Sequence, residues 1–262
     1  MTAVTITHIG GPTALIEFGG WRILTDPTFD PPGRRYFFGW GTMSSKLVGP
    51  SVTPDELGPI DAVLISHHHH ADNLDPTGVS MLPQLGTALT TTKAAKKLGG
   101  GAIGLAPWDT WTLEAPGKET ITVTATPCQH GPVGLNPITG PVIGFALAWA
   151  GQQHGAFWMT GDTVLHGGLR DVASRLDIGT VLMHLGAVRF RYLTGWFRYT
   201  MDARQGAELL DLVKPTSVVP VHYEGWSHFQ QGRDDAERVL AASPYADRVT
   251  WVDPGGATTV TA

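Results

Sequence analysis

Cysteine is almost absent from this chain. Its 262 residues include one cysteine, Cys128, which excludes an internal disulfide framework and a cysteine-rich zinc module. No run approaches the roughly 18 consecutive apolar residues of a membrane-spanning helix, so we expect no integral membrane segment. The first residues show neither the basic nor the apolar region of a signal peptide. We therefore expect a cytoplasmic protein.

Charge is also scarce, and its balance is negative. Charged residues make up 16% of the chain and the formal net charge is −5, whereas non-specific nucleic-acid binding needs a basic face. We therefore expect no nucleic-acid partner. A hydrophobic content of 42% excludes a disordered chain, and the length fits one domain over residues 1–262.

Turn-forming residues are abundant, with 33 glycines and 19 prolines, as folds rich in β-structure require. Residues 27–59 show no clear period and are expected to form a long loop. We expect strands over 4–7, 14–18, 21–24, 62–65, 120–126, 142–150, 156–159, 180–183, 218–221 and 249–252, and helices over 91–98, 168–176, 202–213 and 233–242. This order suits two packed sheets with helices outside them.

Four consecutive histidines, His67 to His70, follow the apolar strand expected over 62–65. Neutral imidazole nitrogens and carboxylates are ligands that Zn²⁺ accepts. Residues two apart on an extended segment face the same side, so we expect His68 and His70 to point at one ion and Asp72 to reach a second position. A solvated histidine loop is the alternative, but the run is internal and follows a buried strand.

Three further candidates each follow an expected strand: His130, Asp162 and His222. Loops at strand ends that gather at one rim are where a rigid scaffold holds a site. Taken singly, each residue has an alternative interpretation as a hydrogen-bonded loop residue. Their shared context favours a joint metal site.

With these motifs, the segments from Thr7 to Gly10 and from Gly20 to Pro27 make the sequence resemble a metallo-β-lactamase superfamily hydrolase. Within that superfamily it is similar to the branch that holds L-ascorbate-6-phosphate lactonases and N-acyl-phosphatidylethanolamine phospholipases D. The resemblance covers nearly the whole chain. It implies an α/β fold, an αββα sandwich of two mixed β-sheets with helices on the outer faces and a metal site along one edge of the sheets.

The resemblance also implies a ligand set. The family's motif is His-x-His-x-Asp-His, and here Asn73 stands where the last histidine is usual. The implied metal ligands are His68, His70, Asp72, His130, Asp162 as the bridging carboxylate, and His222, with Asp26 supporting the site. Counting back from Asp72 and Asn73 favours His68 as the first ligand, but a one-residue bulge would put His67 there instead.

The change to Asn73 predicts two unequal metal positions, because an amide is a poor zinc ligand. We expect one tight Zn²⁺, with Mn²⁺ or iron as alternatives, and a second metal that is weak or absent. A bound metal with an open position lowers the pKa of water to about 7. Asp72 is the expected base or orienting group, and His184, after the strand over 180–183, is the second catalytic candidate or else a core histidine.

The leading prediction is a metal-dependent hydrolase that acts on a small-molecule ester or lactone. The alternatives are a phosphodiesterase or phospholipase D-like hydrolase, and a non-hydrolytic metal-binding or redox protein of the same fold. Residues 189–199 are rich in arginine and aromatic side chains, including Arg191 and Tyr192. This loop would either hold an anionic or ring-bearing substrate or form a homo-oligomer contact.

Overall fold

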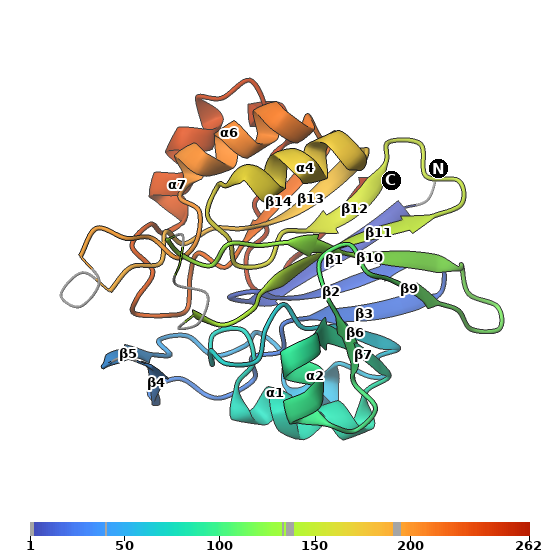
Figure 1. Ribbon diagram of the computed structural model, residues 1–262, viewed down its shortest axis with the longest axis horizontal. Helices are drawn as coiled ribbons and strands as arrows, with labels where there is room; N and C mark the ends of the chain where they lie inside the picture. Colours follow the sequence, from blue (N-terminus) through green and yellow to red (C-terminus); the bar gives the residue numbers. More distant parts are fainter. Residues whose placement is uncertain (1–2, 40, 133, 135–138, 191–194) are drawn as a thin grey trace.

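The computed structural model describes residues 3–39, 41–132, 134, 139–190 and 195–262. Two large β-sheets pack face to face, and helices cover their outer faces (Figure 1). In the first sheet the strand order is β15-β1-β2-β3-β6-β7-β8, and in the second it is β14-β13-β12-β11-β10-β9. Both sheets mix parallel and antiparallel pairs, for instance β3 with β6 and β1 with β2.

The strand bounds of the first sheet are β1 Ala3–Gly10, β2 Thr13–Phe18, β3 Trp21–Thr25, β6 Ala62–Leu64, β7 Thr87–Thr91, β8 Ile103–Leu105 and β15 Ala257–Thr261. Those of the second sheet are β9 Thr110–Leu113, β10 Ile121–Pro127, β11 Ile143–Trp149, β12 Ala156–Met159, β13 Ile178–His184 and β14 Ser217–Val221. Helices α1 Pro76–Met81 and α2 Thr92–Leu98 lie outside the first sheet, and α4 Gly167–Arg175, α6 Ala203–Val213 and α7 Arg233–Ala241 lie outside the second (Figure 1). Within the described residues, we find no helix with the length and apolar character needed to cross a membrane.

The main core lies between the two sheets. In β10 the side chains of Ile121, Val123 and Ala125 are buried in this core, whereas Thr122 between them is exposed, as the two-residue period of a strand requires. Every residue of β13 is buried, because the helices cover its other face. The burial pattern of each strand thus reflects whether its outer face is covered by helices or exposed to solvent.

Two expectations about the chain are wrong. The region 27–59 is not a plain loop, because it contains a separate two-stranded hairpin of β4 Arg35–Gly39 and β5 Thr42–Ser45. The last strand is β15, which pairs with β1, and not residues 249–252. In residues 249–252 the side chains of Val249 and Trp251 pack against the core. The backbone of this segment forms an isolated bridge from Val249 to Val218 rather than a strand of the sheet. Alternation alone does not show whether a neighbouring strand is free to pair.

Candidate metal centre

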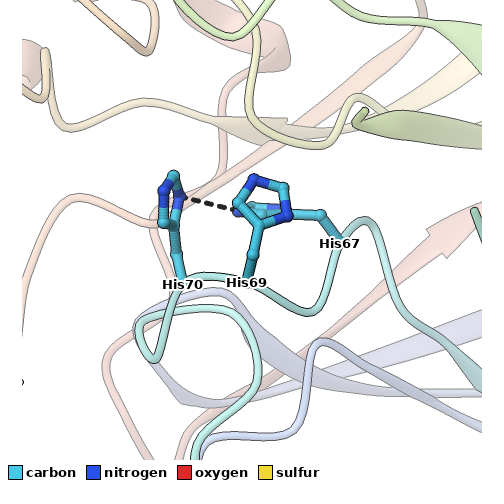
Figure 2. Close-up of side chains that lie close together, drawn as sticks. All are labelled: His67, His69 and His70. Carbon is cyan, nitrogen blue, oxygen red and sulfur yellow. Dashed lines mark hydrogen bonds between the residues drawn. The ribbon is translucent and has the colours of Figure 1, made fainter. Parts of the chain in front are cut away.

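The histidine run lies in a turn and is not extended. After β6 the chain bends, with the amides of Asn73 and Leu74 bonding the carbonyl of His70 at 3.2 and 3.0 Å. The bend brings together residues three apart: His67 Nε2 lies 3.1 Å from His70 Nδ1 (Figure 2). The expectation of an extended segment, in which residues two apart share a side, is therefore wrong for this loop.

A chain of hydrogen bonds orients His67. Asp26 accepts hydrogen bonds from the backbone N–H and the hydroxyl of Ser66, at 2.6 and 2.8 Å. Because the Ser66 hydroxyl hydrogen is used in this way, its oxygen accepts from His67 Nδ1, 3.0 Å away. The lone pair of His67 Nε2 is then directed toward His70, an arrangement typical of metal-ligating histidines.

His130, which follows β10, completes a cluster of three nitrogens. Its Nδ1 donates to the carbonyl of Tyr199 at 2.9 Å, and its Nε2 lies 3.1 Å from His70 Nδ1. His70 Nδ1 carries at most one hydrogen, so it cannot donate to both His67 and His130. A tetrahedral zinc ion with bonds of about 2.0–2.1 Å sets its nitrogens roughly 3.3 Å apart. The cluster therefore suits a cation better than it suits hydrogen bonding.

The three rings are electrostatically prepared for a metal. Burial lowers the pKa of His67 and of His70 well below the usual value, and lowers that of His130 to about 4. The imidazoles are consequently neutral near pH 7, and their lone pairs are available.

A second group joins Asp72, Asp162 and His222, and Asp162 is also grouped with His67 and His130. Oδ1 of Asp72, Oδ2 of Asp162 and Nε2 of His222 are buried without a hydrogen-bond partner among the described residues. Buried polar atoms of this kind are normally satisfied, and carboxylate oxygens with imidazole nitrogen are a metal-binding set. The residues present therefore fit a metal at both positions, and Asp162 belongs to a possible ligand group at each of them.

The second group is held together by charge. Burial raises the pKa of Asp162 to about 7. Burial lowers the pKa of His222, but the carboxylates of Asp162 and Asp72 outweigh it and raise that pKa to about 9. At neutral pH without a metal, His222 is therefore an imidazolium beside the Asp72 carboxylate, and Asp162 is close to half protonated.

His68 lies apart from these clusters. It is half-buried, its pKa is lowered by burial and then by the charges of Lys97 and Lys93, and it belongs to none of the three groups found among the described residues. His69 is grouped with His67 and His70 as a possible metal-binding set (Figure 2), but its Nε2 is bonded to the carbonyl of Thr139. The geometry thus favours His67 over His68 as the first ligand, which is the alternative that assumed a one-residue bulge in the motif.

Asn73 and His184 support the centre from behind. Asn73 Nδ2 lies 3.2 Å from Asp26 Oδ2 and 3.4 Å from Asp162 Oδ1, so the amide donates to carboxylates. His184 is fully buried, with its Nε2 3.5 Å from Asp26 and its ring 5.7 Å from that of His222. It belongs to none of the three possible metal-binding groups of the described residues. This position favours the alternative in which His184 is a core histidine.

His228 is a further residue of the centre that the sequence does not predict. Its Nε2 lies 2.8 Å from Asp72 Oδ2, and its Nδ1 lies 2.5 Å from the hydroxyl of Ser44 in β5. It follows no strand directly, and its partner Ser44 is in the hairpin that was expected to be loop. No motif or spacing in the sequence indicates it.

An aromatic wall faces the histidine cluster. The ring of Phe38, in β4, lies 5.3 Å from that of His70 and 5.1 Å from that of His228. Phe190 stacks on His228 at 5.5 Å and lies 6.0 Å from Phe38. The centre is therefore bordered by apolar rings on the side of the hairpin. Arg191 and Tyr192 of the predicted arginine-rich and aromatic loop lie outside the described residues.

Known proteins resemble this chain in sequence and structure. The sequence model of the family described as the beta-lactamase superfamily domain matches residues 21–223. A UPF0173 metal-dependent hydrolase from Carboxydothermus hydrogenoformans is 27% identical over 224 residues, which cover 84% of this chain and 85% of that protein. Isothiocyanate hydrolase from Delia radicum gut bacteria has a similar structure, with a TM-score of 0.81 and 18% identity over 98% of this chain and 99% of that one. A possible metal-dependent hydrolase from Veillonella parvula has a TM-score of 0.80 and 20% identity over the same shares.

Proposed function

Because this chain belongs to the family of beta-lactamase superfamily domains, we propose that it hydrolyses a small-molecule ester or lactone at a zinc centre. The fold is the metallo-β-lactamase fold that the sequence predicts, and the chain is a metal-dependent hydrolase like its curated relatives. The choice of an ester or lactone goes further and rests on the resemblance to the lactonase branch and on the surroundings of the centre.

The observation that carries the proposal is that His70 Nδ1 lies 3.1 Å from Nε2 of both His67 and His130, although it carries at most one hydrogen to donate. The proposed first position uses these three nitrogens with Asp162. The proposed second position uses Asp72, Asp162 and His222. When bound there, zinc supplies a Lewis acid and lowers the pKa of water to about 7.

The side chains around the centre have distinct proposed roles. Asp72 orients the attacking water and accepts its proton, and His228 holds the Asp72 carboxylate in place through Oδ2. His184 is proposed to support Asp26 and His222 rather than to touch substrate. Phe38 and Phe190 exclude water and favour an uncharged acyl group over a phosphodiester.

The test is a substrate screen on purified protein loaded separately with Zn²⁺, Mn²⁺ and Fe²⁺. The panel contains lactones, aryl esters, an aryl phosphodiester and an aryl isothiocyanate, the last because one structural neighbour carries that activity in its name. We expect ester or lactone turnover that a chelator abolishes and zinc restores, and that is lost in His70→Ala. Turnover of the phosphodiester or the isothiocyanate alone would contradict the substrate class. Retained iron with no hydrolysis would instead support the redox alternative.

A further inference from the structure

An open cavity of about 400 Å³ lies next to the metal centre, between the loop after β10 and the first turn of α6. Its lining residues are Gln129, Gly131, Pro132, Val164, Arg189, Trp196, Phe197, Arg198 and Gln205. Two of the nine are arginines and none is acidic, although the chain as a whole has a net charge of −5. The lining therefore carries positive charge and no acidic side chain, which favours an anion.

The two arginines differ in how they are neutralised. Arg198 forms an ion pair with Asp202, the residue that caps α6. Arg189 forms no ion pair with any described residue, and its Nε is buried without a hydrogen-bond partner among them. The Arg189 guanidinium instead lies 5.6 Å from the centre of the Trp196 ring. A buried N–H without a partner is unfavourable unless a ligand accepts its hydrogen bond.

A second polar group in the cavity is also unsatisfied. Gln205 lies in the first turn of α6, and its Oε1 is buried without a hydrogen-bond partner among the described residues. Rotation of the amide by 180° exchanges its oxygen and its NH₂ group, so this side chain can donate to an anion. The positive end of the helix dipole favours a negative charge at the same place.

Backbone hydrogen bonds fix this arrangement. The amide of Tyr199 bonds the carbonyl of Val188 at 2.9 Å, and the amide of Val188 bonds the hydroxyl of Thr200 at 2.9 Å. The segment with Arg189 and the segment with Arg198 thus run side by side. At the rim, the side chain of Trp196 is 80% exposed and that of Phe197 is 58% exposed, which leaves apolar surface for a ligand to cover.

We propose that this cavity binds the carboxylate of a small organic acid whose apolar body packs against Trp196. The Nε edge of Arg189 presents two parallel N–H groups, which match the two oxygens of a planar carboxylate. Gln205 donates a further hydrogen bond to the same group. The aromatic rim selects an acid with a ring or hydrocarbon chain over a bare inorganic anion.

The position of the cavity assigns it to substrate binding. Gln129 and Gly131 flank the proposed ligand His130, and Val164 follows Asp162 by two residues. The amide of Val164 bonds the carbonyl of Gln129 at 2.9 Å, which ties these walls together. In this assignment the inference rests on the proposed function: the substrate class becomes an ester or lactone that carries a separate carboxylate.

Calorimetric titration of the metal-loaded protein tests binding without turnover. The probes are phenylacetate, inorganic phosphate as an anion without a ring, and benzyl alcohol as a ring without an anion. We expect phenylacetate to bind at least tenfold more tightly than either other probe. Arg189→Gln should weaken it roughly tenfold or more, and Arg204→Gln, an exposed arginine of α6, should not. Phenylacetate that binds Arg189→Gln as tightly as the unaltered protein lies on the metal or elsewhere, and overturns the proposal. Tighter binding of phosphate overturns the choice of a carboxylate.

A second measurement separates the subsite from the chemistry. With aryl esters of a dicarboxylic acid and of the matching monocarboxylic acid, Arg189→Gln should raise KM roughly tenfold for the acid-bearing ester. It should leave kcat, and KM for the neutral ester, nearly unchanged. Equal effects on both esters would overturn the assignment to substrate. If phenylacetate binding depends on Arg189 but no ester is hydrolysed, the carboxylate site stands and the proposed function fails.

Discussion

The metal centre has two halves that are built differently. In the histidine half, His67 and His130 each use Nδ1 in a hydrogen bond to the protein, which leaves their Nε2 lone pairs directed inward. In the carboxylate half, polar atoms of Asp72, Asp162 and His222 are buried without hydrogen-bond partners. The first half is organised by hydrogen bonding and the second by charge.

This difference sets the order of metal binding. Burial keeps the imidazoles of the histidine half neutral, with the pKa of His130 at about 4, so a metal need displace no proton there near pH 7. In the carboxylate half, the raised pKa of His222, about 9, means that a metal must displace a proton. The histidine half should therefore fill first, and the carboxylate half only at higher metal concentration.

The largest expected effect comes from the residue that the two halves share. Asp162→Asn removes a negative charge from both positions while keeping the shape of the side chain. We expect native circular dichroism, loss of bound metal, and a fall in hydrolysis on the order of 100-fold or more. Metal content by mass spectrometry and turnover measure this, with the exposed Asp171→Asn as control. Unchanged metal content and activity would show that Asp162 is not a ligand shared by the two halves.

Substitutions in the histidine loop test which of its residues bind the metal of the histidine half. We expect His67→Ala to lose the tight metal, with affinity falling roughly 100-fold, whereas His68→Ala keeps it because His68 lies outside the cluster. His69→Ala should also retain the metal, since its Nε2 bonds Thr139. Metal titration of the three variants decides the register. Loss of the metal in His68→Ala, together with its retention in His67→Ala, would show instead that His68 is the first ligand.

The sequence predicts more of this centre than of its surroundings. The strands before His130, Asp162 and His222 are an alternating segment and two continuous apolar runs, so their ends could be placed at one rim and the joint site inferred. The choice between His67 and His68 could not be made in this way, because it depends on a loop conformation that the spacing does not determine. Asp26 and His222 adopt positive φ angles of 32° and 60°, which no residue pattern indicates for non-glycine residues.

The rest of the surroundings arise from contacts distant in sequence. His228 bonds Asp72, which is 156 residues away, and Ser44, which is 184 residues away. The aromatic wall depends on the β4–β5 hairpin, whose strands are short and form a two-stranded sheet of their own among the described strands. Local periodicity carries no information about such contacts, since they form only when the fold brings separate loops together.

A smaller effect is expected from the residue that holds Asp72. His228→Ala removes the hydrogen bond to Asp72 Oδ2, so we expect activity to fall roughly tenfold, while the tight metal of the histidine half stays bound. His228→Gln retains a donor and should recover part of the activity. If the alanine variant lost the tight metal, the two halves would not be independent. Turnover and metal content on the same preparations supply the comparison.

The smallest effect is expected where the carboxylate half departs from the usual motif. Asn73 donates to Asp26 and Asp162 through Nδ2, and its amide is a poor zinc ligand, so the unaltered protein should retain about one metal after dialysis. Asn73→His adds an imidazole beside Asp162 and should strengthen the second position several-fold, seen as a second equivalent in a zinc titration. Asn73→Ala removes the same hydrogen bonds without adding a ligand, so it controls for the disturbance of Asp26. The ratio of the two variants isolates the added nitrogen from the lost amide. Two equally tight metals in the unaltered protein would contradict this prediction. They would show that the charge of the carboxylate half gives it the same metal affinity as the histidine half, without a further imidazole.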